Sequence, residues 1–254
     1  MIAASSLSNE EVELLKSYRF LPEIEYSSTY IEASKLTDSK ALRSYLTERL
    51  SLIRTDDIKV AASLFIKRYA FLAVIGLFLM SYRNKKMDLS PENVVLVDRE
   101  KNGMWTPCFY LKNSTVTPFS TQEEKQQFLQ GFFRQHMDVI IQNIKKDSKL
   151  SHIILWENVA VYIFWLYENK NFLQEALSHQ TVEEDFVFLL QNNNGALFGE
   201  YSKNPLARYY TAKVKVKDGE YRVRVRKTCC FSYMLEQGEE TRCNTCPQTC
   251  KVCT

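Results

Sequence analysis

The sequence predicts an α+β fold with a helix-rich body, small antiparallel β-hairpins and a cysteine-rich module at its C-terminal end. Of 254 residues, 45% are hydrophobic and 25% charged, which excludes the collagen-like and disordered classes. Apolar side chains recur at helical spacing along most of the chain, and strand patterns are confined to short segments near turn signals. Six of the seven cysteines stand in the last 26 residues, at positions 229, 230, 243, 246, 250 and 253.

Residues 1–83 form the first expected region, which the pattern predicts to be helical. Ser8 and Glu11 have the spacing of a capping box, in which each side chain bonds the other residue's backbone amide. An acidic start and a long apolar run predict a helix over 55–82. Its most apolar part, 70–80, is 11 residues long, well short of the roughly 20 that span a bilayer. We therefore expect a buried core helix.

The start of the chain lacks the basic and apolar regions of a secretory signal. We therefore expect a cytoplasmic protein, with a peripheral position at the inner face of the membrane as the alternative. Clustered cysteines in the cytosol more often bind metal than form disulfides.

Residues 84–227 form the second expected region, an α+β body that ends in a basic hairpin. Buried strand patterns on either side of Asn102-Gly103 predict a hairpin over 93–111. A second hairpin, over 212–226, is predicted by the Asp218-Gly219 turn signal. Helices are expected at 121–146, 151–168, 171–178 and 182–191.

The basic hairpin, residues 212–226, carries cations on one face. Pairing about its turn places Lys215 opposite Arg222 and Lys213 opposite Arg224, and like charges across a strand pair are destabilising. An anion nearby would relieve this repulsion, whereas a simpler reading is a solvated face that protects a strand edge. The surrounding segment, Ser202 to Lys227, has a net charge of +7, while the other 228 residues sum to −4.

Residues 228–254 form the third expected region, the cysteine module. An adjacent pair, Cys229-Cys230, is followed after twelve residues by Cys243-x2-Cys246 and then by Cys250-x2-Cys253. Such turns converge thiolates on one metal centre, either zinc or an iron–sulfur cluster. Adjacent residues in an extended segment point in opposite directions, which suits a wide binuclear cluster better than one tetrahedral zinc. Disulfides or free thiols remain the third alternative.

This cysteine pattern resembles the C-terminal signature of the FhuF-like ferric-siderophore reductases. The resemblance implies a [2Fe–2S] cluster held by Cys229, Cys230, Cys243 and Cys246, on a helix-rich body that binds the iron chelate. The family pattern has ten residues between the two pairs and this chain has twelve, a surplus that the loop 234–241 can absorb. Cys250 and Cys253 are additional to the pattern.

The resemblance implies one-electron reduction of chelated Fe(III) to Fe(II), which loosens the chelate because siderophores bind Fe(III) far better than Fe(II). An anionic ferric siderophore is the expected substrate, and a flavin- or ferredoxin-type protein the expected electron donor. Transient contact with a membrane transporter is a further expectation. Nucleic acid is not an expected partner, because the basic patch is a single hairpin. The expected substrate-binding residues are Lys213, Lys215, Arg222, Arg224 and Arg226.

Two other functions fit parts of the sequence. In the first, the cysteines form a structural zinc knuckle of a non-enzymatic binding module. In the second, Asp88 and Asn93 belong to a D-L-x-P-x-N pattern like the catalytic loop of kinase-like phosphotransferases. That pattern lacks the glycine-rich loop and the D-F-G motif that accompany it in kinases, so a capped turn before a strand is the favoured interpretation.

Overall fold

The computed structural model describes residues 4–174, 176–215, 222–235 and 242–248. The α-helices are α1 Asn9–Ser17, α2 Ala33–Leu36, α3 Ser39–Glu48, α4 Leu50–Ile53, α5 Ile58–Tyr69, α6 Phe71–Arg83, α7 Gln122–Phe132, α8 Asp138–Ser148, α9 His152–Glu168, α10 Lys170–Leu173 and α11 His179–Leu190. The strands are β1 Phe20–Leu21, β2 Tyr30–Glu32, β3 Lys85–Met87, β4 Val94–Val97, β5 Glu100–Lys101, β6 Met104–Trp105, β7 Cys108–Leu111, β8 Val116–Pro118, β9 Val214–Lys215 and β10 Arg222–Val223. Short turns of other helix types are η1 Phe133–Met137, η2 Gly195–Leu197, η3 Ala207–Tyr209 and η4 Ser232–Met234.

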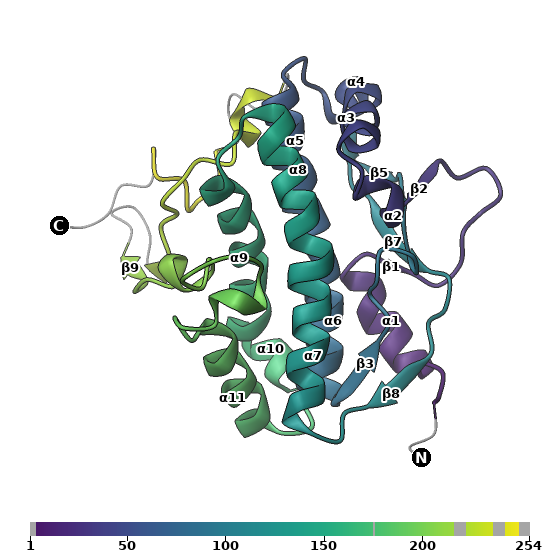
Figure 1. The fold of residues 1–254 in the computed structure, drawn as a ribbon, viewed down its shortest axis with the longest axis vertical. Coiled ribbons are helices and arrows are strands. Elements are labelled where there is room, and N and C mark those ends of the chain that lie inside the picture. Colours follow the sequence, from purple (N-terminus) through teal and green to yellow (C-terminus); the bar gives the residue numbers. More distant parts are fainter. Residues whose placement is uncertain (1–3, 175, 216–221, 236–241, 249–254) are drawn as a thin grey trace.

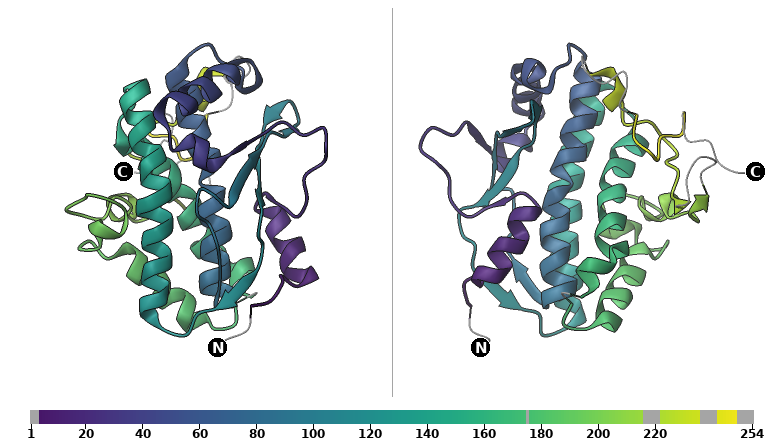
Figure 2. Two further views of the ribbon diagram at one scale, coloured as in Figure 1. Left: turned by 45° about the vertical axis from the view of Figure 1, so that its right-hand side comes forward. Right: turned by 180° about the vertical axis from the view of Figure 1, so that it is seen from behind.

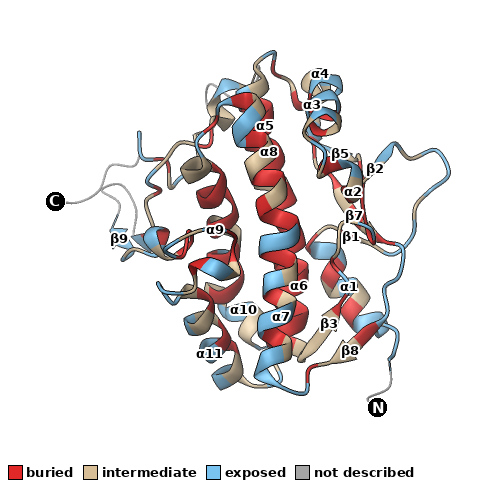
Figure 3. Ribbon diagram, viewed as in Figure 1, coloured by how far each residue is buried: buried red, intermediate tan, exposed pale blue. Residues whose placement is uncertain are grey.

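The centre of the fold is a rod formed by α5 and α6, with the small sheet on one side and α9 on the other (Figures 1 and 2). Asp57 caps its N-terminus, as the acidic start predicts, by accepting a hydrogen bond from Lys59 N. The rod, Ile58–Arg83, is 26 residues long and apolar enough to cross a membrane, but 89% of its most apolar window is buried inside the protein. The expectation of a buried core helix is therefore confirmed. In Figure 3 the parts of α5 and α6 that are visible behind α7 and α8 are mostly coloured as buried.

The main sheet has the strand order β1-β7-β4-β2. The predicted hairpin is its centre, since β4 pairs antiparallel with β7 and matches Leu96 with Phe109. Between β4 and β7, strands β5 and β6 form a short antiparallel ribbon at the tip of this hairpin. Asn102 and Gly103, at the turn of the ribbon, adopt the positive φ angles that such turns require.

The N-terminal region is not purely helical, which corrects the expectation for residues 1–83. Strand β1 pairs parallel with β7, and β2 pairs antiparallel with β4. Both strands are two or three residues long, too short to give a recognisable alternation of apolar and polar side chains. The predicted capping box of α1 is confirmed, with Ser8 and Glu11 bonding each other's amides.

Helices α7 and α8 are joined by the π-helical turn η1 into one continuous helical segment, where the sequence predicts a single helix. The buried ring of His136, in this turn, bonds the hydroxyl of Tyr69 at 2.6 Å and the carbonyl oxygen of Leu89 at 2.7 Å. These bonds tie the α7–η1–α8 segment to α5 and to the loop before β4.

The C-terminal cysteine segment lies against the rod and α9, at the end of the molecule where α5 begins (Figure 1). Turn η4 of this segment contacts α5 directly. The division of the chain at residues 83 and 227 stays a prediction.

Candidate metal centre

Four cysteines line one small cavity, which we call the cysteine cavity. Its walls come from residues 228–233 and 242–247, and its sulfurs belong to Cys229, Cys230, Cys243 and Cys246. The side chains of Cys229 and Cys246 hydrogen-bond to each other, as do those of Cys230 and Cys243. The described cysteines form no disulfide. Cys250 and Cys253 lie outside the described residues.

Local backbone geometry brings the two cysteine pairs together. The Cys243-x2-Cys246 segment is a turn in which Cys246 N donates to the carbonyl oxygen of Cys243 at 2.8 Å. Directly after Cys229-Cys230 the chain reverses at Phe231, whose φ angle is +62°. The amide of Phe231 then points back and donates to the sulfur of Cys229 at 3.4 Å.

Polar groups lie beside the sulfur of Cys230 and favour its thiolate form. Lys67 of α5 places its ammonium 3.6 Å from the sulfur of Cys230, and the hydroxyl of Ser232 lies 3.2 Å from the same atom. The hydrogen bond with Cys243, together with the nearby charges of Lys67 and Arg226, lowers the pKa of Cys230 against the opposing effect of burial. Burial and the same hydrogen bond raise the pKa of Cys243.

This donor set fits a binuclear iron–sulfur cluster. Four thiols in two pairs match the four cysteine ligands that a [2Fe–2S] cluster takes.

A buried polar network fastens the cysteine segment to α9. Glu157, only 2% exposed, accepts hydrogen bonds from Lys227 N at 2.6 Å and Thr228 N at 2.7 Å, and also from the Thr228 hydroxyl. The guanidinium of Arg226 lies 3.7 Å from the same carboxylate and donates to the side-chain oxygen of Asn158 at 2.5 Å. Both partners on α9 thus hold the residues that precede Cys229.

The network continues through α5 to a cysteine. Asn158 donates to the hydroxyl of Ser63 at 2.9 Å, and that hydroxyl donates to the carbonyl oxygen of Cys230 at 2.9 Å. No sequence motif marks Ser63, Lys67, Glu157 or Asn158 as residues of the site. One signal was available, because Glu157 and Asn158 interrupt an otherwise apolar helical run, and polar residues in such runs are buried only with partners.

The described part of the basic hairpin has the predicted register, with Lys215 opposite Arg222. Its turn, Asp218-Gly219, lies outside the described residues. Within the described chain, the exposed side chains of Lys215 and Arg222 form no ion pair.

The other cations of the hairpin have internal partners. Glu168, at the end of α9, pairs with Lys213 at 2.7 Å and also with Arg224. Glu168 therefore supplies an anion that relieves the repulsion between Lys213 and Arg224. Arg226 is 5% exposed and faces α9, so a contact with substrate would require the Glu157 network to open.

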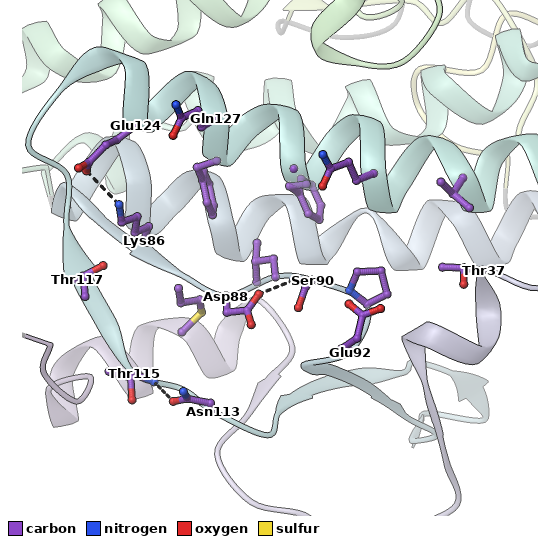
Figure 4. A pocket seen from close by; sticks show the side chains of 18 residues that line it. Thr37, Lys86, Asp88, Ser90, Glu92, Asn113, Thr115, Thr117, Glu124 and Gln127 are labelled. Carbon is purple, nitrogen blue, oxygen red and sulfur yellow. Dashed lines mark hydrogen bonds and ion pairs between the residues drawn. The ribbon is translucent and has the colours of Figure 1, made fainter.

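The Asp88–Asn93 pattern forms a capped turn. The Asn93 amide donates to the carbonyl oxygens of Asp88 and Asn113, and its side-chain oxygen accepts from Asn113 N. Asp88 accepts a hydrogen bond from Ser90 N. These bonds occupy Asn93 in holding the turn, which lines a cavity of about 880 Å³ that also contains the Lys86–Glu124 ion pair (Figure 4).

Comparisons with known proteins agree with this site. Residues 63–211 match the family model described as "Ferric iron reductase FhuF-like transporter", and residues 226–248 match the "FhuF 2Fe-2S C-terminal domain". The second match contains all four cysteines of the cysteine cavity and confirms the expected cofactor.

A solved structure, aerobactin synthetase IucC from a hypervirulent pathotype of Klebsiella pneumoniae, is similar over 73% of this chain at 12% identity, with a TM-score of 0.47. The chain spans 36% of that protein's length. A search of curated proteins found no match.

Proposed function

Because the chain belongs to the FhuF-like ferric iron reductase family, we propose that it reduces siderophore-bound Fe(III) to Fe(II) and so releases iron in the cytosol. The observation that carries the proposal is the convergence of Cys229, Cys230, Cys243 and Cys246 on one cavity within the matched iron–sulfur domain. A [2Fe–2S] cluster bound there supplies single electrons. An external flavin- or ferredoxin-type donor supplies each electron, and the chelated Fe(III) accepts it.

The chain's own residues position and polarise this site. Glu157 and Asn158 hold the segment before Cys229, so the sulfurs keep their places when the charge of the site changes. Lys67 places a positive charge beside Cys230 and therefore favours the more negative, reduced state. Lys215 and Arg222 present exposed positive charge on the side of the molecule that carries the cysteines, and this charge would attract an anionic chelate.

The burial of the α5–α6 rod and the reductase family fit a soluble cytoplasmic protein. Transient docking to a membrane transporter at the inner face of the membrane is part of the proposal. There the protein would meet the incoming chelate.

Iron and labile-sulfide analysis of anaerobically purified protein tests the cluster. We expect about two iron atoms and two sulfides per chain and a reddish-brown colour that fades on reduction. Serine at any of the four cavity cysteines should abolish this content. Cys108→Ser, in strand β7 away from the site, is the matched control, and Cys250→Ser with Cys253→Ser should also retain the cluster. A colourless protein with one zinc would contradict the proposal.

The hairpin contribution is tested separately with Lys215→Ala/Arg222→Ala. We expect weaker affinity for an anionic ferric chelate, with iron content unchanged, because neither side chain contacts the cysteine cavity. Unchanged affinity would show that the hairpin does not serve the substrate.

A further inference from the structure

A second cavity includes Lys227, the residue before Thr228 of the cysteine cavity, and we call it the α9 cavity. It measures about 720 Å³ and is lined by the first turns of α9, by residues 201–209 and by Lys227. Ligand-binding cavities in proteins commonly measure about 300–1,000 Å³. The α9 cavity therefore has room for a metal chelate.

The charge of the α9 cavity is positive. Lys203, Arg208 and Lys227 line it with exposed side chains, and its described lining residues include no carboxylate. Within the described chain, none of these three cations forms an ion pair. The cavity at the Asp88–Asn93 turn (Figure 4) differs in charge, because Asp88, Glu92 and Glu124 line it. Of the two, only the α9 cavity suits an anion.

The charged groups around His152 agree with this positive environment. His152 lines the cavity at the N-terminus of α9, a position that itself favours anions. Burial lowers the pKa of His152, and the charges of Lys145 and Arg208 lower it further, whereas Asp138 has the opposite effect. The cationic side chains therefore outweigh the carboxylate at this position.

Aromatic side chains form a rigid wall of the α9 cavity. The hydroxyl of Tyr201 accepts a hydrogen bond from Trp156 Nε1 at 3.0 Å and donates to Asp138 at 2.6 Å. Tyr209 donates to the carbonyl oxygen of Ile153 at 2.6 Å. Since these bonds fix the rings, an organic chelate would meet a preformed surface.

The α9 cavity also lies next to the cysteines along the chain. Lys227 lines it, and Thr228 and Cys229 line the cysteine cavity. Consecutive Cα atoms are about 3.8 Å apart, so the Cα atoms of Lys227 and Cys229 are at most about 7.6 Å apart. A chelate in the α9 cavity would therefore sit close to the electron source.

We infer that the α9 cavity is the binding site for an anionic ferric chelate, with Lys203, Arg208 and Lys227 pairing with its carboxylates and the aromatic wall packing on its organic part. This inference rests on the proposed reductase function and gives it a substrate site. The basic hairpin then attracts the chelate, and the α9 cavity holds it.

Gallium(III) citrate is the test probe, because it has the shape and negative charge of the ferric complex and cannot be reduced. Its affinity for cluster-loaded protein is measured by isothermal titration calorimetry. We expect Lys203→Ala/Arg208→Ala to weaken binding about tenfold or more, the combined effect of two exposed ion pairs. Lys215→Ala/Arg222→Ala should weaken it less. The control is Lys40→Ala/Lys101→Ala, which makes the same charge change at distant exposed positions and should leave affinity intact.

Three results would overturn the inference: no binding to the wild type, equal affinities of the cavity and control variants, or a loss confined to the hairpin variant. Each leaves the reductase proposal standing if the wild type contains iron and sulfide. Conversely, a wild type without iron and sulfide refutes the reductase proposal whatever the binding data show. Iron content of the Lys203→Ala/Arg208→Ala variant should equal that of the wild type, which separates lost binding from a lost cluster.

Discussion

Glu157→Gln removes the carboxylate that fastens the cysteine segment to α9. The substitution keeps the size of the side chain but places an amide NH2 among donors, namely Lys227 N, Thr228 N and the Thr228 hydroxyl. It also leaves the charge of Arg226 without its carboxylate, at a side chain that is 3% exposed. Breaking a buried ion pair by removing one partner costs about 3–5 kcal/mol, a large part of the roughly 5–15 kcal/mol that stabilises a typical domain.

Urea unfolding of the full chain under anaerobic conditions measures this loss, and iron content after gel filtration measures retention of the cluster. We expect the free energy of unfolding to fall by about 3 kcal/mol or more, together with loss of iron, because the segment before Cys229 loses its anchor. Glu183→Gln, at an exposed position of α11, is the matched control and should change stability by less than about 0.5 kcal/mol. A loss below about 1 kcal/mol with full iron content would refute the anchoring role.

Three further predictions concern Lys67, His136 and the last two cysteines of the sequence. Lys67→Met should lower the cluster's reduction potential by on the order of 40 mV in a redox titration, because a charge interaction of about 1 kcal/mol with the reduced state is lost. Lys59→Met, at an exposed position of the same helix, is the control and should leave the potential unchanged. Burial lowers the pKa of His136 from 6.5 to about 4, so below pH 6.5 the unfolded state takes up the proton first. Stability should therefore fall by about 3 kcal/mol between pH 6.5 and 4 in urea titrations, a slope that His136→Gln should flatten. Cys250→Ser/Cys253→Ser should leave the visible spectrum and reduction potential unchanged, and a loss of either would assign these thiols to the cluster.

The features that the sequence predicts well are local. The capping box of α1, the turn at Cys243-x2-Cys246 and the pairing of Lys215 with Arg222 each depend on residues close together in the chain. Their geometry follows from backbone preferences within one turn, so spacing alone is enough to predict them.

The features that the sequence does not predict depend on contacts between distant segments. Glu157 meets Lys227 across 70 residues, and Lys67 meets Cys230 across 163. Strand β1 is recognisable only through its pairing with β7. The basic hairpin was expected to have an anion nearby, and Glu168 is one such anion, because the end of α9 packs against Lys213 and Arg224. Tertiary packing decides these contacts, and no local pattern encodes them.

Single-turnover reduction of a ferric chelate tests the reductase account most directly. Anaerobically reduced protein is mixed with ferric citrate, and Fe(II) is measured with a ferrous-specific chromophore while the cluster's absorbance is followed. We expect about one Fe(II) per chain, formed as the visible absorbance of the oxidised cluster returns, and none from Cys243→Ser. A reduced, iron-loaded wild type that keeps its electron and produces no Fe(II) would contradict the account.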